Sequence, residues 1–180
     1  MMHGFRSMAT MAMAAGMLAF TPAQAQAQTQ TPEQSATALA HQWARAVTTR
    51  DVDAQMKLLP VAMYAKPGER ERNRLQRLHE KEVALINKQQ IIAFDVRAPI
   101  QTLKIDKTTA VVIPYQSIVT VAEGKLQTDS VLVALSEDGS DKWSIFDGTG
   151  HTTRSLKSLI PGYTTGLSVS PARSQLIRGE

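Results

Sequence analysis

Hydrophobic residues recur every three to four positions in the first part of the chain and every second position from Ile91 onward. The first spacing is typical of amphipathic helices, and the second is typical of strands with one buried face. The pattern therefore predicts helices first and antiparallel strands afterwards, joined by hairpin-length connections. This order favours an α+β fold, in which N-terminal helices pack on one face of a curved antiparallel sheet. The chain lacks the βαβ alternation of dinucleotide-binding folds.

The first predicted helix has a strong start signal. Thr31 is a good N-cap residue, Pro32 occupies the first helical position, and Gln34 completes a capping box. The helix is expected to end near Arg50, and its apolar face consists of Ala36, Leu39, Ala40, Trp43, Ala46 and Val47. A second, short helix is predicted over 51–59, with an aspartate as its N-cap.

The segment from Tyr64 to Gly68 is predicted to be a turn, because it ends in a Pro-Gly pair. A charged helix is expected next, within the stretch GERERNRLQRLHEKEVALINKQQ. Opposite charges three residues apart, as in Glu69 and Arg72, stabilise such a helix. We interpret this segment as a solvated surface helix with a thin buried edge rather than as a partner site.

The alternating part of the chain predicts five strands. The first places Ile92, Phe94 and Val96 on one face, and the others are expected over Thr102–Ile105, Ala110–Val121, Leu126–Ser136 and Lys142–Asp147. A short helix is expected at Thr152–Ile160. The long third strand has a second apolar face that includes Val112 and Ile118.

The N-terminal 25 residues have the three parts of a secretory signal peptide. Arg6 gives a positive start, an apolar run extends from Met8 to Phe20, and small residues alternate with glutamine before a cut after Ala25 or Ala27. The apolar run is shorter than the roughly 20 residues that a membrane span needs. We therefore expect a cleaved signal and a periplasmic or secreted protein without a membrane span.

Composition fits one exported domain. The chain has no cysteine, so neither a disulfide nor a lipid-anchored cysteine stabilises or tethers it. We expect a disordered linker over 26–31, a single domain over 32–163 and a flexible tail over 164–180. Without Arg6, the chain has 19 basic and 16 acidic residues, and these are interleaved. This arrangement argues against a nucleic-acid partner, which requires clustered positive charge.

Three stretches carry a family resemblance: the capped helix with Trp43 followed by Asp51-Val52-Asp53, the strands AVVIPYQSIVTVAEGKLQTDSVLVALSEDGSDKWSIFDGTG, and the closing SLKSLIPGY. Within the second stretch, the marked features are Pro114-Tyr115, the run LVALSEDG, Trp143 and FDG. Together they resemble a group of uncharacterised secreted bacterial proteins with a nuclear transport factor 2-like (cystatin-like) fold. The resemblance implies a cone formed by a strongly bent antiparallel sheet around N-terminal helices. It implies no single function, because that fold hosts enzymes and binding modules alike.

Two residues are candidates for catalysis in such a cone. The isomerases and dehydratases that share the implied fold use a carboxylate base beside a hydrogen-bond donor for an oxyanion. Tyr115 lies on the apolar face of its strand, and Asp147 has the strand parity of Trp143 and Ile145, so both side chains can point into a cone. The simpler alternative is that Asp147 caps the turn before the last helix and that Tyr115 is a core residue.

Trp43 and Tyr64 are candidates for the mouth of an apolar pocket, which would also include Tyr115 and Asp147; alternatively, Trp43 only fills the cone. The histidines His41, His79 and His151 lack metal-ligand spacing, so neither a metal nor a cofactor is expected.

The leading hypothesis is a non-enzymatic domain that binds a small apolar ligand or a protein partner. The first alternative is an isomerase or dehydratase that uses Asp147 and Tyr115. The second is a homodimerisation module that pairs through the outer face of the sheet, where Val112 and Ile118 lie.

Overall fold

A computed structural model describes residues 30–65, 77, 80–81, 90–136, 140–169 and 171–178, except for the side chains of Tyr64 and Ala65. The predicted signal peptide and residues 26–29 of the predicted linker lie outside this part of the chain. The same holds for most of the charged helix expected after Gly68, including His79, and for residues 137–139 between the fourth and fifth predicted strands.

The N-terminal helices begin where the capping signals predict. Helix α1 spans Pro32–Thr48, and Thr31 and Gln34 form the expected capping box. Helix α2 spans Val52–Leu58 and begins at Asp51, whose Oδ1 accepts a hydrogen bond from the Ala54 amide at 2.9 Å. A further helical turn, α3, spans Ala62–Ala65, so the prediction of a turn beginning at Tyr64 is wrong for its first two residues.

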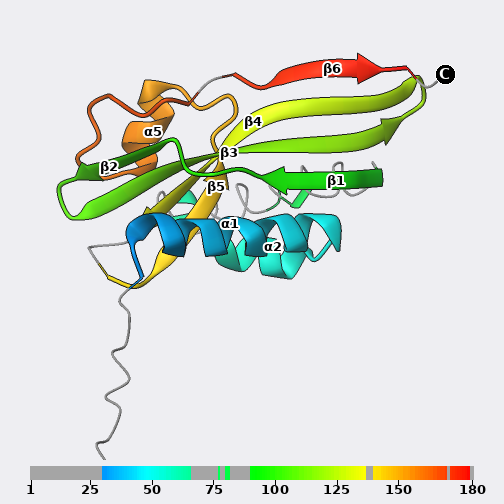
Figure 1. Ribbon diagram of the computed structural model, residues 1–180. Coiled ribbons are helices and arrows are strands. Elements are labelled where there is room, and N and C mark those ends of the chain that lie inside the picture. The colour runs from blue at the N-terminus through cyan, green and yellow to red at the C-terminus, as the bar shows by residue number, and fades with distance from the viewer. Residues whose placement is uncertain are drawn as a thin grey trace, which may run out of the picture.

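The five predicted strands are present and antiparallel (Figure 1). Their bounds are Gln90–Val96 for β1, Gln101–Ile105 for β2, Thr108–Val121 for β3, Gly124–Ser136 for β4 and Trp143–Asp147 for β5. The open sheet has the order β1-β3-β4-β5, with β2 pairing to β3 beside β1. Helix α5, at Thr153–Leu159, follows β5. The α+β fold class is therefore confirmed.

A sixth strand lies within the segment 164–180, which was expected to be a flexible tail. Strand β6 spans Arg173–Ile177 and pairs antiparallel with β4 from Lys125 to Asp129. Its side chains are all exposed, so the hydrophobic pattern contains no signal for it. Strand β5 pairs with the other end of β4, from Leu132 to Ser136. Strand β4 thus has two partners in succession along the same edge.

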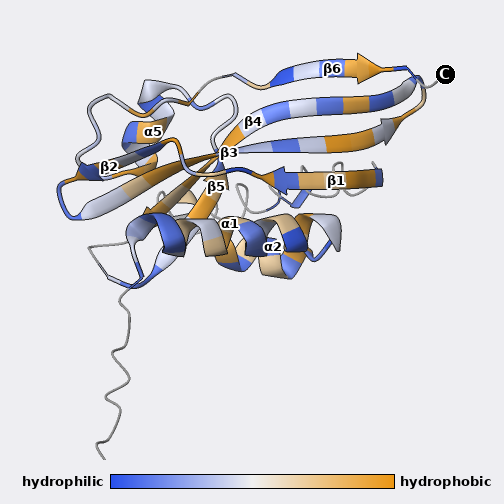
Figure 2. Cartoon of the chain, in the orientation of Figure 1, coloured by the Kyte–Doolittle hydropathy of each residue, from blue (hydrophilic) through white to orange (hydrophobic). Residues whose placement is uncertain are grey.

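The two faces of the sheet are covered by different helices. We call the face that carries Ile113 and Tyr115 the inward face and the opposite one the outer face. Helices α1 and α2 lie along the inward face, and α5 lies across the sheet from them (Figure 1). Figure 2 shows the hydrophobic positions concentrated where β3, β4 and β5 meet α1. None of the described helices is long and apolar enough to cross a membrane.

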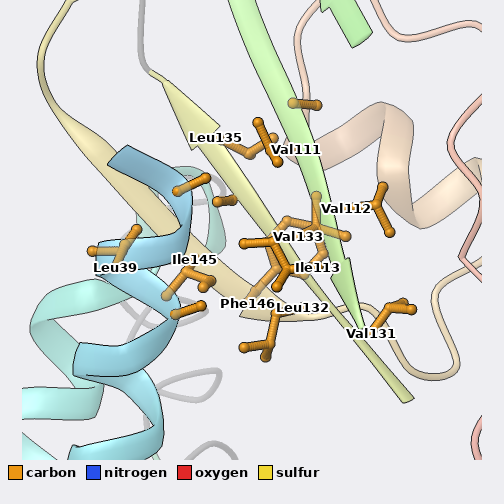
Figure 3. Packing of buried hydrophobic residues seen from close by; sticks show 14 of the residues in the cluster. Leu39, Val111, Val112, Ile113, Val131, Leu132, Val133, Leu135, Ile145 and Phe146 are labelled. Carbon is orange, nitrogen blue, oxygen red and sulfur yellow. The ribbon is translucent and has the colours of Figure 1, made fainter. Parts of the chain in front are cut away.

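The core lies at this junction. Figure 3 shows Ile113, Leu132 and Ile145 gathered between β3 and α1. Val112 belongs to the outer face and is also completely buried, because α5 and the segment after it contribute to the same core. Val112 is therefore not available to a dimer interface on the outer face, contrary to the premise of the homodimer alternative.

Strand β1 departs from simple alternation. Its pairing with β3 shifts between Ile91 and Ala93, which is the signature of a β-bulge. The bulge turns Ile91 inward together with Phe94, and it leaves Ile92 49% exposed. The prediction that Ile92 shares the buried face of Phe94 is therefore wrong, because one extra residue reverses the parity of the strand.

Candidate functional site

A cavity of about 580 Å³ lies between the N-terminal helices and one half of the inward face. Its walls include Trp43 of α1, Leu59 after α2, Phe94 of β1, and Val119 and Leu126 of the β3–β4 hairpin. These are apolar side chains from segments far apart in the sequence. The cavity has the volume and lining of a small-molecule site.

The register of β3 and β4 explains where the cavity begins. Opposite residues on the inward face are Ile113 and Leu132, then Tyr115 and Ser130, then Ser117 and Thr128. The first pair is completely buried against α1, whereas Ser117 and Thr128 line the cavity. Because small polar side chains replace large apolar ones after Tyr115, the space beneath α1 is not filled there.

Tyr115 and Asp147 meet where the core ends and the cavity begins. The Tyr115 hydroxyl donates a hydrogen bond of 2.7 Å to Asp147 Oδ2. Asp147 stands opposite Leu132 on β4, and Tyr115 stands opposite Ser130, so one inward-facing step along β4 separates them. The expected shared orientation of these two candidates is therefore observed.

The other oxygen of Asp147 shapes the turn after β5. Asp147 Oδ1 accepts a hydrogen bond of 2.8 Å from the Thr149 amide, which is the capping role considered from the sequence. Gly148 donates its amide to the Val131 carbonyl at 2.8 Å. A Cβ at Gly148 would lie only 2.9 Å from a Val131 methyl group, so glycine is needed here for close approach of the two strands. The Thr149 and Ser130 hydroxyls then bond to each other.

The Tyr115 phenol keeps its proton. Burial, and then the negative charge of Asp147 and the hydrogen bond to it, raise the pKa of Tyr115 well above its usual value. The Tyr115 ring also stacks on Phe94, with ring centroids 4.5 Å apart and planes 8° from parallel. Tyr115 is therefore held in place at both its ring and its hydroxyl.

His151 lies on the same side of the cavity as Asp147. Its ring is half-buried and meets Phe146 edge-on, with centroids 5.0 Å apart, and Nδ1 lies 3.2 Å from Ser155 Oγ. Burial lowers the pKa of His151, and the nearby Asp147 charge partly opposes that shift. His151 is therefore a neutral imidazole at neutral pH.

The structure brings together three of the four residues proposed from the sequence. Trp43, Tyr115 and Asp147 all line the cavity, and Trp43 is also part of the buried core. The backbone of Tyr64 lies in α3, but its side chain is outside the described part of the chain. Sequence reasoning did not find Phe94, Ser117, Thr128, Thr149 and His151 as lining residues. The Ser117 and Thr128 positions did carry a signal, since polar residues interrupt an apolar strand face there.

Within the described residues, no group of three or more His, Asp or Glu side chains is placed to hold a metal ion. Comparison with known proteins gives no further lead, because no family model, no curated protein and no solved structure matches the chain.

Proposed function

We propose that this protein is an exported domain that holds a small, largely apolar ligand in the cavity beneath α1. The observation that carries the proposal is the cavity of about 580 Å³, which has apolar walls and a few hydrogen-bonding groups gathered near one side. We further propose that the sheet and helices form a nuclear transport factor 2-like cone. In that fold, the space between the helices and the bent sheet is a natural ligand site.

The enzymatic alternative draws on the contact between Tyr115 and Asp147. An isomerase or dehydratase would need Asp147 to accept a proton from the substrate and Tyr115 to donate a hydrogen bond to the resulting oxyanion. The single Tyr115 proton instead goes to Asp147. The two groups satisfy each other, so this geometry favours binding over proton transfer.

A direct test of the ligand site uses the neutral dye Nile red and a pair of adjacent substitutions. Val119→Phe fills the cavity from the inward face, whereas Ile118→Phe adds the same ring on the outer face. We expect the wild type and Ile118→Phe to enhance the dye fluorescence with similar affinity and Val119→Phe to lose at least tenfold. Thr128→Phe provides a second obstruction if Val119→Phe does not fold. Equal affinity in all the folded variants would contradict the proposed site.

Export is tested separately by the mass of the protein recovered after expression with its natural N-terminus. Signal cleavage predicts a mature chain that begins at Gln26 or Gln28, in the secreted or periplasmic fraction. An intact chain that begins at Met1 in the cytoplasm would contradict export but would leave the ligand site untouched.

A further inference from the structure

The polar side of the cavity consists of the Tyr115 and Asp147 side chains together with Thr149 and His151. Among the lining residues that the structure describes, Asp147 is the only side chain charged at neutral pH. The remaining polar groups in that lining are hydroxyls, an amide and a neutral imidazole. A ligand that enters the cavity therefore meets one fixed negative charge.

The hydrogen bonds to the Asp147 carboxylate leave some of its acceptor sites available to a ligand. Tyr115 gives its only proton to Asp147, and the Thr149 amide also donates to that carboxylate. An ionised carboxylate has about four lone-pair sites, and these two donors occupy two of them. The Thr149 and Ser130 hydroxyls bond to each other, which uses one of their two protons. A ligand that brings its own donor is therefore better matched than one that brings an acceptor.

Aromatic rings lie in the same cavity. Trp43 lines it from α1, and the stacked pair of Phe94 and Tyr115 lines it from the sheet. The faces of aromatic rings attract cations, tryptophan most strongly, and the attraction grows when water is excluded. Aromatic walls and one carboxylate are the combination by which proteins recognise an ammonium group on an apolar body.

We propose that the ligand of this cavity is a hydrophobic amine, whose protonated nitrogen pairs with Asp147 while its apolar body lies against Trp43, Phe94 and Val119. This inference rests on the proposed function and specifies its ligand class. It excludes fatty acids and phosphate esters, because their anionic groups would be repelled by the Asp147 carboxylate. Neutral alcohols share the apolar body and a donor, but they lack the charge.

The test compares three compounds with one common body: 4-phenylbutylamine, 4-phenylbutanol and 4-phenylbutanoate. Competition with Nile red on the full mature chain, at pH 7 and low salt, gives their relative affinities. We expect the amine to bind about tenfold more tightly than the alcohol, and the carboxylate to bind most weakly. Asp147→Asn should weaken amine binding about tenfold and change alcohol binding by less than twofold.

Asp95→Asn is the matched control, because Asp95 is an exposed carboxylate of β1 that does not line the cavity. It removes the same charge and should leave all three affinities unchanged. If Asp147→Asn does not fold, the wild type is tested at increasing salt: amine binding should weaken and alcohol binding should not.

Three results separate the two proposals. If the three compounds bind alike, or if none of them displaces bound Nile red, the amine inference is wrong and the ligand site stands. If the preference for the amine survives in Asp147→Asn, its assignment to Asp147 is wrong. If Nile red does not bind the wild type at all, the proposed function itself fails.

Discussion

The two halves of the inward face of β3 and β4 are built from the same two strands, but one half is packed and the other lines a cavity. In the half nearer β5, Ile113 and Leu132 face each other and are completely buried beneath α1. In the other half, Ser117 and Thr128 face each other and line a cavity. Figure 2 shows the corresponding change along β4, from a hydrophobic run to alternating polar and apolar residues.

The difference shows how one sheet can hold a packed core and a cavity side by side. The backbone pairing of β3 with β4 continues without interruption through both halves, so the cavity does not result from a break in the sheet. It results from side-chain volume, because two small polar residues stand where the other half has isoleucine and leucine. Tyr115 and Asp147 stand at the boundary and close the packed half toward the cavity. One half thus stabilises the domain, and the other is available for function.

The largest loss of stability is expected from a substitution in the packed half, which contains Ile113 and Leu132. Leu132→Ala should lower the free energy of unfolding by about 3 kcal/mol, because it leaves a cavity in a completely buried site. Leu126→Ala, the matched change in the cavity half, should cost about 1 kcal/mol, since Leu126 is only partly buried and its neighbourhood is already open. Urea unfolding of both variants measures the contrast, and equal losses would remove the distinction between the halves.

The next largest effect on stability is expected at Tyr115, on the boundary between the two halves. Tyr115→Phe removes a hydrogen bond to a carboxylate and should cost about 1.5 kcal/mol at pH 7. The raised pKa of Tyr115 means that the unfolded chain loses this proton near pH 10 while the folded chain retains it. Wild-type stability should therefore fall as the pH rises above about 10, and this part of the fall should be absent in Tyr115→Phe. If the stability of the two proteins fell in parallel above pH 10, the raised pKa of Tyr115 would be contradicted.

The smallest expected effect concerns His151, on the cavity side of the boundary. Its lowered pKa means that the unfolded chain takes up a proton near pH 6.5 before the folded chain does. This histidine therefore favours folding above pH 6.5, and that contribution is lost as the pH falls below 6.5. His151→Asn should flatten the acid side of the stability curve slightly, as measured by melting temperature between pH 7.5 and 5.5. If the melting temperature of the variant fell more steeply with falling pH than that of the wild type, the lowered pKa of His151 would be contradicted.

Much of the fold could be predicted from the sequence because alternation along the strands is strong. The bounds of β3, β4 and β5 agree with the prediction to within about two residues, and α1 begins at its capping box. Strand β6 could not be predicted, since it is held by backbone pairing with β4 and all its side chains are exposed. The bulge in β1 also escaped prediction, because Ile91, Ile92 and Phe94 are all apolar and fit either register.

The candidate site could be predicted from the sequence only for residues whose side-chain direction follows from their place in the alternation of a strand. Parity alone placed Tyr115 and Asp147 on faces that could meet, and the structure joins them by a hydrogen bond. Ile91 reaches the cavity through the bulge, and His151 through the turn after β5. Neither path has a local pattern in the sequence, because both depend on how distant segments pack.

The most direct measurement uses the two tryptophans of the chain, which lie in different places. Trp43 lines the cavity, whereas Trp143 lies with Pro32 and Ser35 at a separate surface depression. Eleven residues of helix separate Pro32 from Trp43, which corresponds to about 16 Å. Trp143→Phe therefore leaves a reporter inside the proposed site, and Trp43→Phe leaves a reporter outside it.

Titration with 4-phenylbutylamine and 4-phenylbutanol should change the emission of Trp143→Phe in a saturable manner and leave that of Trp43→Phe unchanged. A saturable change in Trp43→Phe alone would contradict a ligand site beneath α1, and no change in either folded variant with either compound would contradict the proposed ligand class.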